Sequence, residues 1–443
     1  MELKERLNWS NLILLIILVT FLFFRFYQIN QRVSFDWDQE RDAQVVKKIL
    51  SGRLTLLGPR VLGPDKFFWA PYFYYLLAPF YLLTNLHPRA IIYFLLFYNL
   101  AFFILAYWVL KKLFSRQTAL IFLLFWSVNK ATIAADTIAW NPVIVPILVI
   151  GLLGILNKLN WFYLGILLSV GINFHFQIIF LVVLTAIFLF LNKKVNLRGV
   201  LISFLGFSLP FFPLLLFDLR HNFLNTNLFF KFLKDRGGGG DFFAWTPVFK
   251  NFLSGFLAID ISEIIALFFL FSFSITAFLI AKKQKSPFLK HFFTSSAIFL
   301  TVFLLGFSIY GQRPSEYYFN FLIPFLILII AELFKKWRFG PILTLILALF
   351  WAYQSIALLK PLPLSLENKD RAVRYLAQIA QGQEINVAFS MPLGRDTGYR
   401  YLLDYYKVRL SDKPEAPLYK IVIPPNQERV TAIIGNIGIF VPQ

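Results

Sequence analysis

Long apolar runs recur along the first 358 residues, and they constrain the fold more strongly than any other feature of the sequence. A helix that crosses a bilayer needs about 20 predominantly apolar residues. The chain is 58% hydrophobic, which is more than a soluble globule of this length buries. The sequence therefore predicts an all-α polytopic membrane protein with about eleven transmembrane helices. The expected spans are 10–27, 88–110, 117–135, 142–157, 160–175, 176–192, 199–217, 256–280, 289–310, 318–334 and 339–358.

Lys and Arg gather in short loops between the apolar runs, and this pattern indicates the membrane topology. The formal net charge is +20, but a nucleic-acid binder concentrates its basic residues on a solvated face, so nucleic acid is not an expected partner. A cytoplasmic N-terminus puts the basic loops on the cytoplasmic side, in agreement with the positive-inside rule. The basic residues of these loops are Lys111, Lys112, Arg116, Lys158, Lys193, Lys194, Arg198, Lys282, Lys283, Lys285, Lys290, Lys335, Lys336 and Arg338. The segments expected on the extracytoplasmic face are 28–87, 136–141, 173–177, 218–255, 311–317 and 360–443.

The first apolar segment, Ser10 to Phe26, lacks a small-residue cleavage site, so we expect it to stay in the protein as an anchor. The chain contains no cysteine, which excludes disulfides, thiolate metal ligands and a cysteine nucleophile. Together these features predict a multi-pass protein of the plasma membrane.

The composition becomes mixed and polar after Pro361 and Pro363. "NKDRAVRYLAQIAQG" and "TGYRYLLDYYK" have the periodicity of helices, whereas "EINVAFS" and "YKIVIP" are typical of strands. The sequence therefore predicts a transmembrane domain over 1–358 and a small extracytoplasmic α/β domain over 359–443. The second domain contains no metal or nucleotide motif, and we expect it to have a structural or acceptor-guiding role.

The stretch "SFDWDQERDAQVV", residues 34–46, places four acids in seven positions directly after the first span. Asp36 and Gln39 have the spacing of a capping box, and Val45, Val46, Ile49 and Leu50 form an apolar stripe. These features predict a short amphipathic helix in the plane of the membrane. "APYFYYLLAPFYLL", residues 70–83, is broken by two prolines and predicts a second in-plane helix.

Asp38 and Asp42 share one face of the first in-plane helix, where like charges four residues apart repel each other. This weakly unfavourable arrangement indicates a functional use. The alternative is that Asp36 caps the helix, Asp38 lies at the favourable end of the helix dipole, and the other acids are solvated.

Several loose motifs occur in a fixed order along the chain. They are "DQERDA" (38–43), "FFWAPYFYYLLAP" (67–79), "KKLFSR" (111–116), "AADTIAWNP" (134–142) and "GQRPSEYYFNFLIP" (311–324). In these motifs and their order, residues 1–358 resemble the polyprenyl-phosphate-dependent membrane glycosyltransferases of the GT-C fold. This family includes the protein O-mannosyltransferases (glycosyltransferase family 39) and the aminoarabinose transferases that modify lipid A. Gln39 stands where the family usually has Glu, which leaves open whether one or two carboxylates act.

The resemblance implies transfer of a sugar from a polyprenyl-phosphate donor to a hydroxyl of a protein, lipid or glycan acceptor at the outer membrane surface. Its matched motif makes Asp38 the candidate general base, with Gln39 and Asp42 as substrate-binding residues. The departing phosphate needs cations and hydrogen-bond donors. Candidates on the outer face are Lys66, Arg220, His221, Arg313 and Tyr317, and candidates for holding the sugar are Asp136, Asn141, His175 and Gln177.

Structural explanations compete with several of these assignments. Arg313 could be a solvated loop residue, Arg220 and His221 could snorkel to the interface, and His175 and Gln177 could join two helices. No cofactor beyond the donor is expected. A divalent cation held by Asp36 and Asp38 is the alternative.

Three other classes of protein compete with this interpretation. A polyprenyl-linked glycan polymerase or ligase shares the chemistry and is the nearest of them. A secondary transporter would show internal repeats and paired broken helices, and in a non-catalytic scaffold Asp38 would tolerate alanine.

Overall fold

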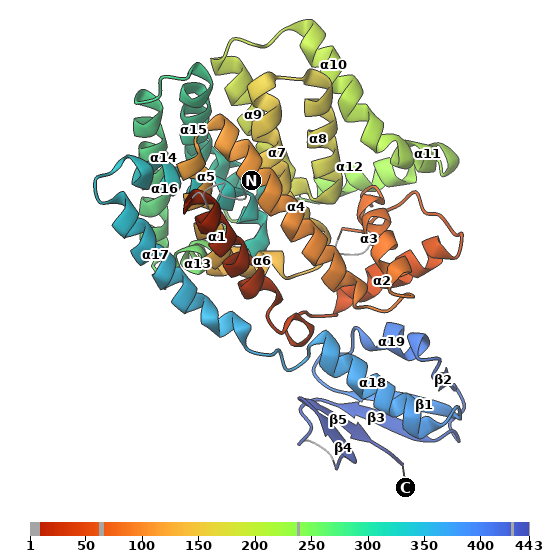
Figure 1. The fold of residues 1–443 in the computed structure, drawn as a ribbon. Coiled ribbons are helices and arrows are strands. Elements are labelled where there is room, and N and C mark those ends of the chain that lie inside the picture. Colours follow the sequence, from red (N-terminus) through yellow and green to blue (C-terminus); the bar gives the residue numbers. More distant parts are fainter. Residues whose placement is uncertain (1–8, 62–65, 237–239, 427–428, 443) are drawn as a thin grey trace, which may run out of the picture.

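Apolar helices form a bundle, and a small sheet domain is attached at one end of it (Figure 1). The computed structural model describes residues 9–442 apart from 62–65, 237–239 and 427–428. The α-helices of the bundle are α1 (Trp9–Phe26), α2 (Trp37–Leu50), α3 (Tyr72–Leu83), α4 (Ala90–Leu113), α5 (Arg116–Val128), α6 (Lys130–Asp136), α7 (Val145–Lys158), α8 (Trp161–Phe174), α9 (Ile179–Leu191), α10 (Leu197–Ser208), α11 (Phe212–Arg220), α12 (Leu224–Arg236), α13 (Thr246–Leu257), α14 (Glu263–Lys282), α15 (Pro287–Tyr310), α16 (Ile323–Lys336) and α17 (Gly340–Ser355). The 3-10 helices are η1 (Ile29–Gln31), η2 (Asn141–Ile144), η3 (Phe176–Ile178), η4 (Leu209–Phe211), η5 (Glu316–Leu322) and η6 (Ile356–Leu359).

The predicted spans are present as apolar helices. Within the described residues, eight helical stretches are long and apolar enough to cross a membrane, and the bent pair of α5 and α6 makes a ninth. The predicted spans 160–175 and 176–192 correspond to the shorter apolar helices Trp161–Phe174 and Phe176–Leu191. The prediction of an all-α polytopic bundle is confirmed, and so are the two short helices α2 and α3 in the first outer loop.

The predicted span 117–135 is not one straight helix, because α5 and α6 meet at an angle of 73°. Asn129 separates them, and its side-chain oxygen accepts hydrogen bonds from the backbone N–H groups of Ala131 and Thr132. These bonds satisfy donors at the start of α6 that have no partner inside the helix. The bend therefore results from an N-cap within the apolar run.

The predicted start of the span 256–280 is wrong. The chain leaves α13 at Ala258, whose backbone is left-handed (φ 60°), and α14 begins only after Ser262 caps it. The apolar residues of α13 thus belong to a separate helix. Together α12 and α13 occupy much of the outer loop 218–255, where the sequence had predicted no helix.

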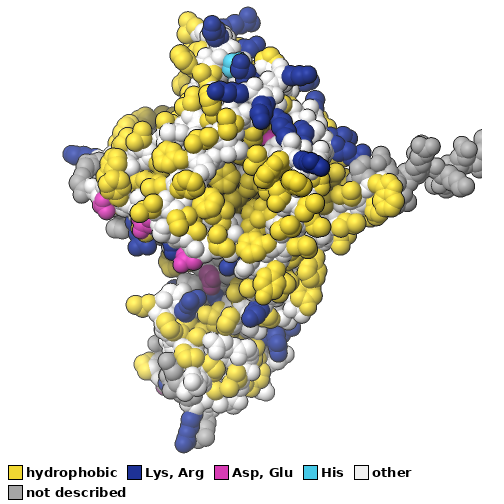
Figure 2. All heavy atoms as spheres, turned by 90° about the vertical axis from the view of Figure 1, so that its left-hand side faces the viewer, with side chains coloured by type: hydrophobic (Ala, Val, Ile, Leu, Met, Phe, Trp, Pro, Cys, Tyr) yellow, Lys and Arg dark blue, Asp and Glu magenta, His cyan; other side chains and the backbone are white. Residues whose placement is uncertain are grey.

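The loops rich in Lys and Arg lie together at one end of the bundle, which we call the basic end. Phe114 at the α4–α5 turn packs against Phe292 near the start of α15. A hollow of about 480 Å³ is lined by Lys158 at the end of α7, Lys194 between α9 and α10, and Phe288 at the start of α15. Figure 2 shows Lys and Arg side chains gathered at this end, away from the small domain. The loops are therefore segregated as the charge pattern predicted, while the side of the membrane on which they lie stays a prediction.

The small domain follows η6 and is built on a five-stranded sheet of order β2-β1-β3-β5-β4. Strand β1 runs parallel to β2 and β3, whereas β5 is antiparallel to β3 and β4. Both helices and both strands predicted for this region are present, and the α/β class is confirmed. The elements are α18 (Leu366–Ala380), β1 (Glu384–Ser390), α19 (Tyr399–Tyr405), β2 (Arg409–Leu410), β3 (Leu418–Val422), β4 (Ala432–Ile434) and β5 (Ile437–Phe440).

One apolar core runs from α2 and α3 into the small domain. Val46 of α2 and Tyr81 of α3 belong to the same buried cluster as Val373 of α18 and Ile439 of β5, and each of these four side chains is fully buried. Apolar burial of this kind is the main source of stability at an interface between elements. The small domain is therefore packed against the first outer loop, as Figure 1 also shows for α18, α19 and α2.

Candidate active site

Helix α2 carries the acids of the first outer loop, and its start is fixed by the predicted capping box. The backbone N–H of Asp36 donates to Gln39 Oε1 at 3.0 Å, and the Asp36 side chain caps the helix in return. Asp38 follows in the first turn, and its side chain is 39% exposed. The cap therefore holds a solvent-accessible carboxylate in a defined orientation.

Arg41 connects the two aspartates that were predicted to repel each other. Its Nη1 lies 2.8 Å from Asp38 Oδ1, and its Nε and Nη2 lie 2.8 and 2.7 Å from Asp42 Oδ1. Opposite charges three residues apart stabilise a helix, so the repulsion between Asp38 and Asp42 is offset. This role of Arg41 was not among the predictions, although its position between the two acids in the sequence was a usable signal.

Asp42 is almost completely enclosed, with 1% of the side chain exposed, and its Oδ2 has no hydrogen-bond partner. Burial, only partly offset by the Arg41 guanidinium, raises the pKa of Asp42 to about 7. A carboxyl group of this kind changes its charge in the physiological range of pH.

We expect Asp42 to make the protein less stable as the pH rises from about 4 to about 7. Over this interval the unfolded chain, with a pKa of 3.8, has released the proton that the folded chain keeps. Above the pKa of the folded state, Asp42 is ionised in both states, so its contribution to the free energy of unfolding no longer changes with pH. The measurement is the midpoint of thermal unfolding against pH for the wild type and for Asp42→Asn, and their difference should follow this course. A pH-independent difference would contradict the assignment.

A chain of contacts leads from α2 to the other predicted outer loops. Gln39 Nε2 donates to the backbone carbonyl of Ala139 at 3.0 Å. The neighbouring Trp140 packs on Tyr317 with ring centroids 4.5 Å apart, and the His175 ring lies 5.4 Å from the same tyrosine. The segments 136–141, 173–177 and 311–317 are therefore brought together next to α2.

Hydrogen bonds hold these three segments in place. With its amide nitrogen facing them, Gln177 donates to the backbone carbonyls of Tyr317 and Tyr318, each at 3.0 Å. The Asn141 side chain donates to the carbonyl of Phe174. Gln177 is completely buried, so it fixes the backbone beside Tyr317 and has no surface left for a substrate.

A turn that carries Lys66 joins the same assembly. The Gly58 N–H donates to the Trp69 carbonyl at 2.6 Å, and a Cβ at position 58 would lie 2.1 Å from a carbonyl oxygen, so only glycine fits there. Asn173, two residues before His175, accepts a hydrogen bond from Ala70 N at 3.1 Å. This contact connects the turn to the 173–177 segment.

The other side of this turn contacts the α11–α12 corner, where Arg220 and His221 lie. Asn225 accepts from Phe68 N at 2.7 Å and donates to its carbonyl at 3.2 Å. The Lys66 ammonium lies 5.4 Å from the ring centre of Phe232 on α12. Lys66 and the corner are therefore on neighbouring elements.

The remaining cationic candidates are exposed. His221 Nδ1 lies 2.8 Å from the Phe217 carbonyl and its ring stacks on Phe217. Arg220 is exposed at the end of α11, and Arg313 is exposed in the loop between α15 and η5. The exposed arginines are free to reach a ligand, and their predicted contact with phosphate stays a prediction.

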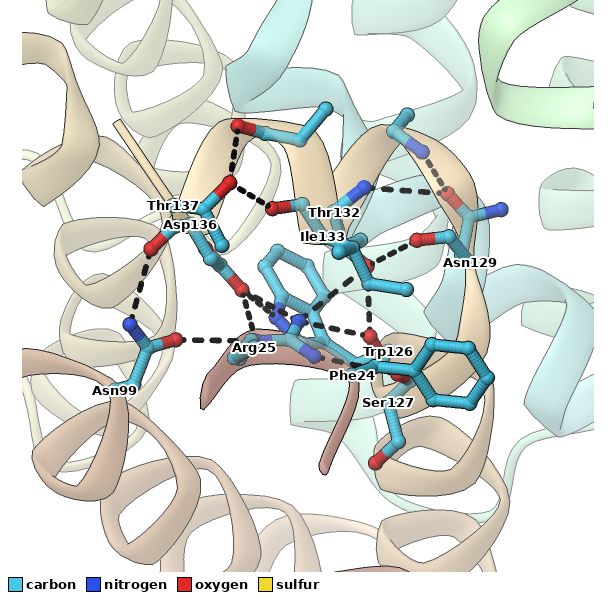
Figure 3. Close-up of polar contacts among 12 residues, drawn as sticks. Phe24, Arg25, Asn99, Trp126, Ser127, Asn129, Thr132, Ile133, Asp136 and Thr137 are labelled. Carbon is cyan, nitrogen blue, oxygen red and sulfur yellow. Dashed lines mark hydrogen bonds and ion pairs between the residues drawn. The ribbon is translucent and has the colours of Figure 1, made fainter. Parts of the chain in front are cut away.

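Asp136 occupies a different environment from the one predicted for a substrate-binding residue. Its Oδ2 accepts hydrogen bonds from Arg25 Nη2 at 2.6 Å, Arg25 Nε at 2.9 Å and Trp126 Nε1 at 2.9 Å (Figure 3). Arg25 is completely buried and Asp136 is 2% exposed. The ion pair joins the last turn of α1 to the end of α6. The structure thus gives Asp136 a scaffold contact, and its predicted contact with sugar stays a prediction.

A groove of about 730 Å³ lies against α3 and α4, and none of the predicted site residues lines it. Among the described residues, no group of three or more His, Asp or Glu could hold a metal ion. Asp36 is paired with Lys369, and Asp38 is paired with Arg41.

These features define a class: a polytopic helical bundle in which a short acid-bearing helix, α2, lies among converging loops. Solved structures share this fold. ArnT from Cupriavidus metallidurans bound to undecaprenyl phosphate matches with a TM-score of 0.59 and 11% identity, over 98% of this chain and 99% of that one. Its apo structure gives a TM-score of 0.61. An Archaeoglobus fulgidus oligosaccharyltransferase in complex with Zn and sulfate gives 0.51 with 15% identity, over 95% of this chain and 58% of that one.

The comparison with ArnT confirms that the chain has the GT-C-like fold expected from the sequence. The match extends over the small domain, whereas the motifs in the sequence covered only residues 1–358. No protein-family model matches the sequence, and no curated protein matches it.

Proposed function

We propose that this protein is an integral membrane glycosyltransferase that moves a sugar from a polyprenyl-phosphate donor to an acceptor hydroxyl. The observation that carries the proposal is the convergence of α2 with three outer loops through Gln39, Ala139, Trp140 and Tyr317. This convergence occurs in a chain with the fold of ArnT, a protein solved with undecaprenyl phosphate. A lipid-linked donor needs a site at the membrane surface, where these loops meet.

We assign the basic end to the cytoplasm and the end with the small domain to the extracytoplasmic face of the plasma membrane. Short loops rich in Lys and Arg stay on the cytoplasmic side, and five such loops agree in this protein. The N-terminus then lies in the cytoplasm and the small domain lies outside. The acceptor would be a protein, lipid or glycan on that face.

Asp38 is the general base of the proposed reaction. The acceptor oxygen forms a bond to the anomeric carbon of the sugar while the bond from that carbon to the phosphate oxygen breaks. The phosphate leaves on the polyprenyl carrier, and the Asp38 carboxylate takes the acceptor proton. Asp38 suits this role because its side chain is accessible and its helix is capped. Asp42 supports it by holding Arg41, which contacts Asp38.

Cations and hydroxyl groups stabilise the charge that develops on the departing phosphate. Lys66 lies on the turn next to α12, and Arg313 lies in the loop before η5. Arg220 and His221 lie at the α11–α12 corner beside the turn. Tyr317 can supply a hydroxyl at the centre of the aromatic contacts.

Aromatic faces and backbone groups hold the sugar in the proposed complex. Trp140 and Tyr317 present adjacent rings, which suit the C–H faces of a sugar, and His175 lies beside them. Gln39, Asn141 and Gln177 act by fixing the backbone around these rings.

The proposal is tested by measuring sugar transfer in membranes that contain the protein and are supplied with polyprenyl-phosphate sugars. We expect transfer above that of membranes without the protein, and we expect it to survive EDTA. The second expectation follows because Asp36 and Asp38 are engaged by Lys369 and Arg41. Loss of transfer on chelation, restored by a divalent cation, would support the metal alternative. Absence of transfer from every polyprenyl-phosphate sugar would contradict the proposed function.

A further inference from the structure

The small domain contacts α2 at the residues that fix its start. Lys369 of α18 is completely buried, and its Nζ lies 2.6 Å from Asp36 Oδ1. The same ammonium donates to the backbone carbonyls of Phe35 at 2.9 Å and Thr397 at 2.8 Å. A buried ammonium is stable only when it is paired and hydrogen-bonded. Lys369 therefore depends on α2 for its partners, and the cap of α2 depends on Lys369.

A second contact lies one turn further along the helix. Glu40 is 7% exposed, and its two carboxylate oxygens accept hydrogen bonds from Gly398 N and Tyr401 N, each at 2.8 Å. These donors belong to the start of α19. Asp36 and Glu40 thus bind the small domain, while Asp38 between them remains accessible.

The backbones also approach closely at this interface. Gly398 has a φ of +87°, and a Cβ there would lie 1.9 Å from the Phe35 carbonyl oxygen. Leu366 N donates to the Val33 carbonyl at 2.9 Å. Contacts this close leave little freedom for the segment that leads into α2.

We propose that the small domain holds the acidic helix in its working position, with Lys369 as the positioning residue for Asp38. This inference rests on the proposed function, because it assumes that Asp38 is the base. Lys369 touches the cap residue Asp36, two positions before Asp38, and does not itself contact Asp38. Displacing the start of α2 by about 1 Å would misplace the carboxylate and slow the reaction about 100-fold.

The kinetic test compares Lys369→Met with Arg374→Met in the full-length protein. Arg374 lies on the same helix and pairs with Asp370 inside the small domain, so its loss leaves the contacts to α2 intact. We expect Lys369→Met to lower kcat for transfer about 100-fold with KM for donor and acceptor within about twofold of the wild type. Arg374→Met should transfer at nearly the wild-type rate. In Lys369→Met the Asp36 carboxylate loses its cation. Because this side chain is 46% exposed, water can solvate it, and the variant does not leave an enclosed carboxylate without a partner.

A measurement that does not depend on activity separates this inference from the proposed function. The chain has no cysteine, so a cysteine that replaces the exposed Gln44 of α2 takes a spin label at one position only. We expect the electron paramagnetic resonance spectrum to show a more mobile label in Lys369→Met. In Arg374→Met the mobility of the label should be the same as in the wild type. If no variant transfers sugar but the label responds in this way, the transferase proposal fails, while the finding that Lys369 holds the start of α2 in place stands. Three results for Lys369→Met would each overturn the inference. They are a label as immobile as in the wild type, a wild-type kcat, and a change confined to a higher KM for the acceptor.

Discussion

Replacement of Asp38 by asparagine is expected to lower the rate of sugar transfer at least about 100-fold. The substitution keeps the size and shape of the side chain but removes the group that accepts the proton from the acceptor hydroxyl. The loss should appear in kcat, because the carboxylate acts as the bond to the anomeric carbon forms and is not needed to bind the donor. The measurement is the initial rate of transfer in membranes at saturating donor.

The matched control is Asp404→Asn in α19. Asp404 is also an aspartate in contact with α2, where it pairs with Lys47, but its side chain is 61% exposed. Exposed ion pairs contribute about 0–1 kcal/mol, so this variant should fold and transfer sugar normally. Transfer by Asp38→Asn at the rate of the control would refute the role of Asp38 as the base.

Local features of the sequence predicted local structure well. Asp36 and Gln39 have the spacing of a capping box, and both hydrogen bonds of the box are present. The strand expected at "EINVAFS" has the predicted bounds, Glu384–Ser390. Such features depend on residues a few positions apart. Sequence spacing therefore contains the information that is needed.

Contacts between distant segments could not be read in this way. Lys369 and Asp36 are separated by 333 positions, and nothing near Lys369 distinguishes it from the many exposed lysines of the chain. Gln39 and Ala139 meet across 100 positions, through a backbone carbonyl that any residue could supply. The packing of the helices decides which loops meet, and no local pattern encodes it.

Arg25 is an intermediate case, because a signal was present and was not used. An arginine near the end of an apolar span is unfavourable unless it has a partner, which makes it a marker of a buried contact. Asp136 was selected as a site residue, but the two were not connected. The bend at Asn129 brings the end of α6 to α1, whereas the apolar run 117–135 predicts one straight span.

The buried pair of Arg25 and Asp136 should have the largest effect on stability. We expect Arg25→Met to destabilise the protein by about 3–5 kcal/mol, because it leaves the Asp136 carboxylate enclosed without its cation. Trp126 Nε1 remains as a hydrogen-bond donor to this carboxylate, but it carries no charge. The measurement is unfolding of the detergent-solubilised protein by heat or denaturant.

The double variant Arg25→Met with Asp136→Leu distinguishes an uncompensated charge from a loss of packing. If the enclosed carboxylate causes the loss, removing it as well should restore much of the stability, since apolar residues of similar volume often replace a buried ion pair at little cost. The two single effects are then strongly non-additive.

Lys47→Met provides the exposed comparison and should change the stability by about 1 kcal/mol or less, because both members of its pair with Asp404 are open to solvent. If the double variant loses as much stability as the two single variants added together, then side-chain packing, and not the ion pair, holds α1 against α6. In that case the position of Asp136 would depend on the bend at Asn129 and not on its charge.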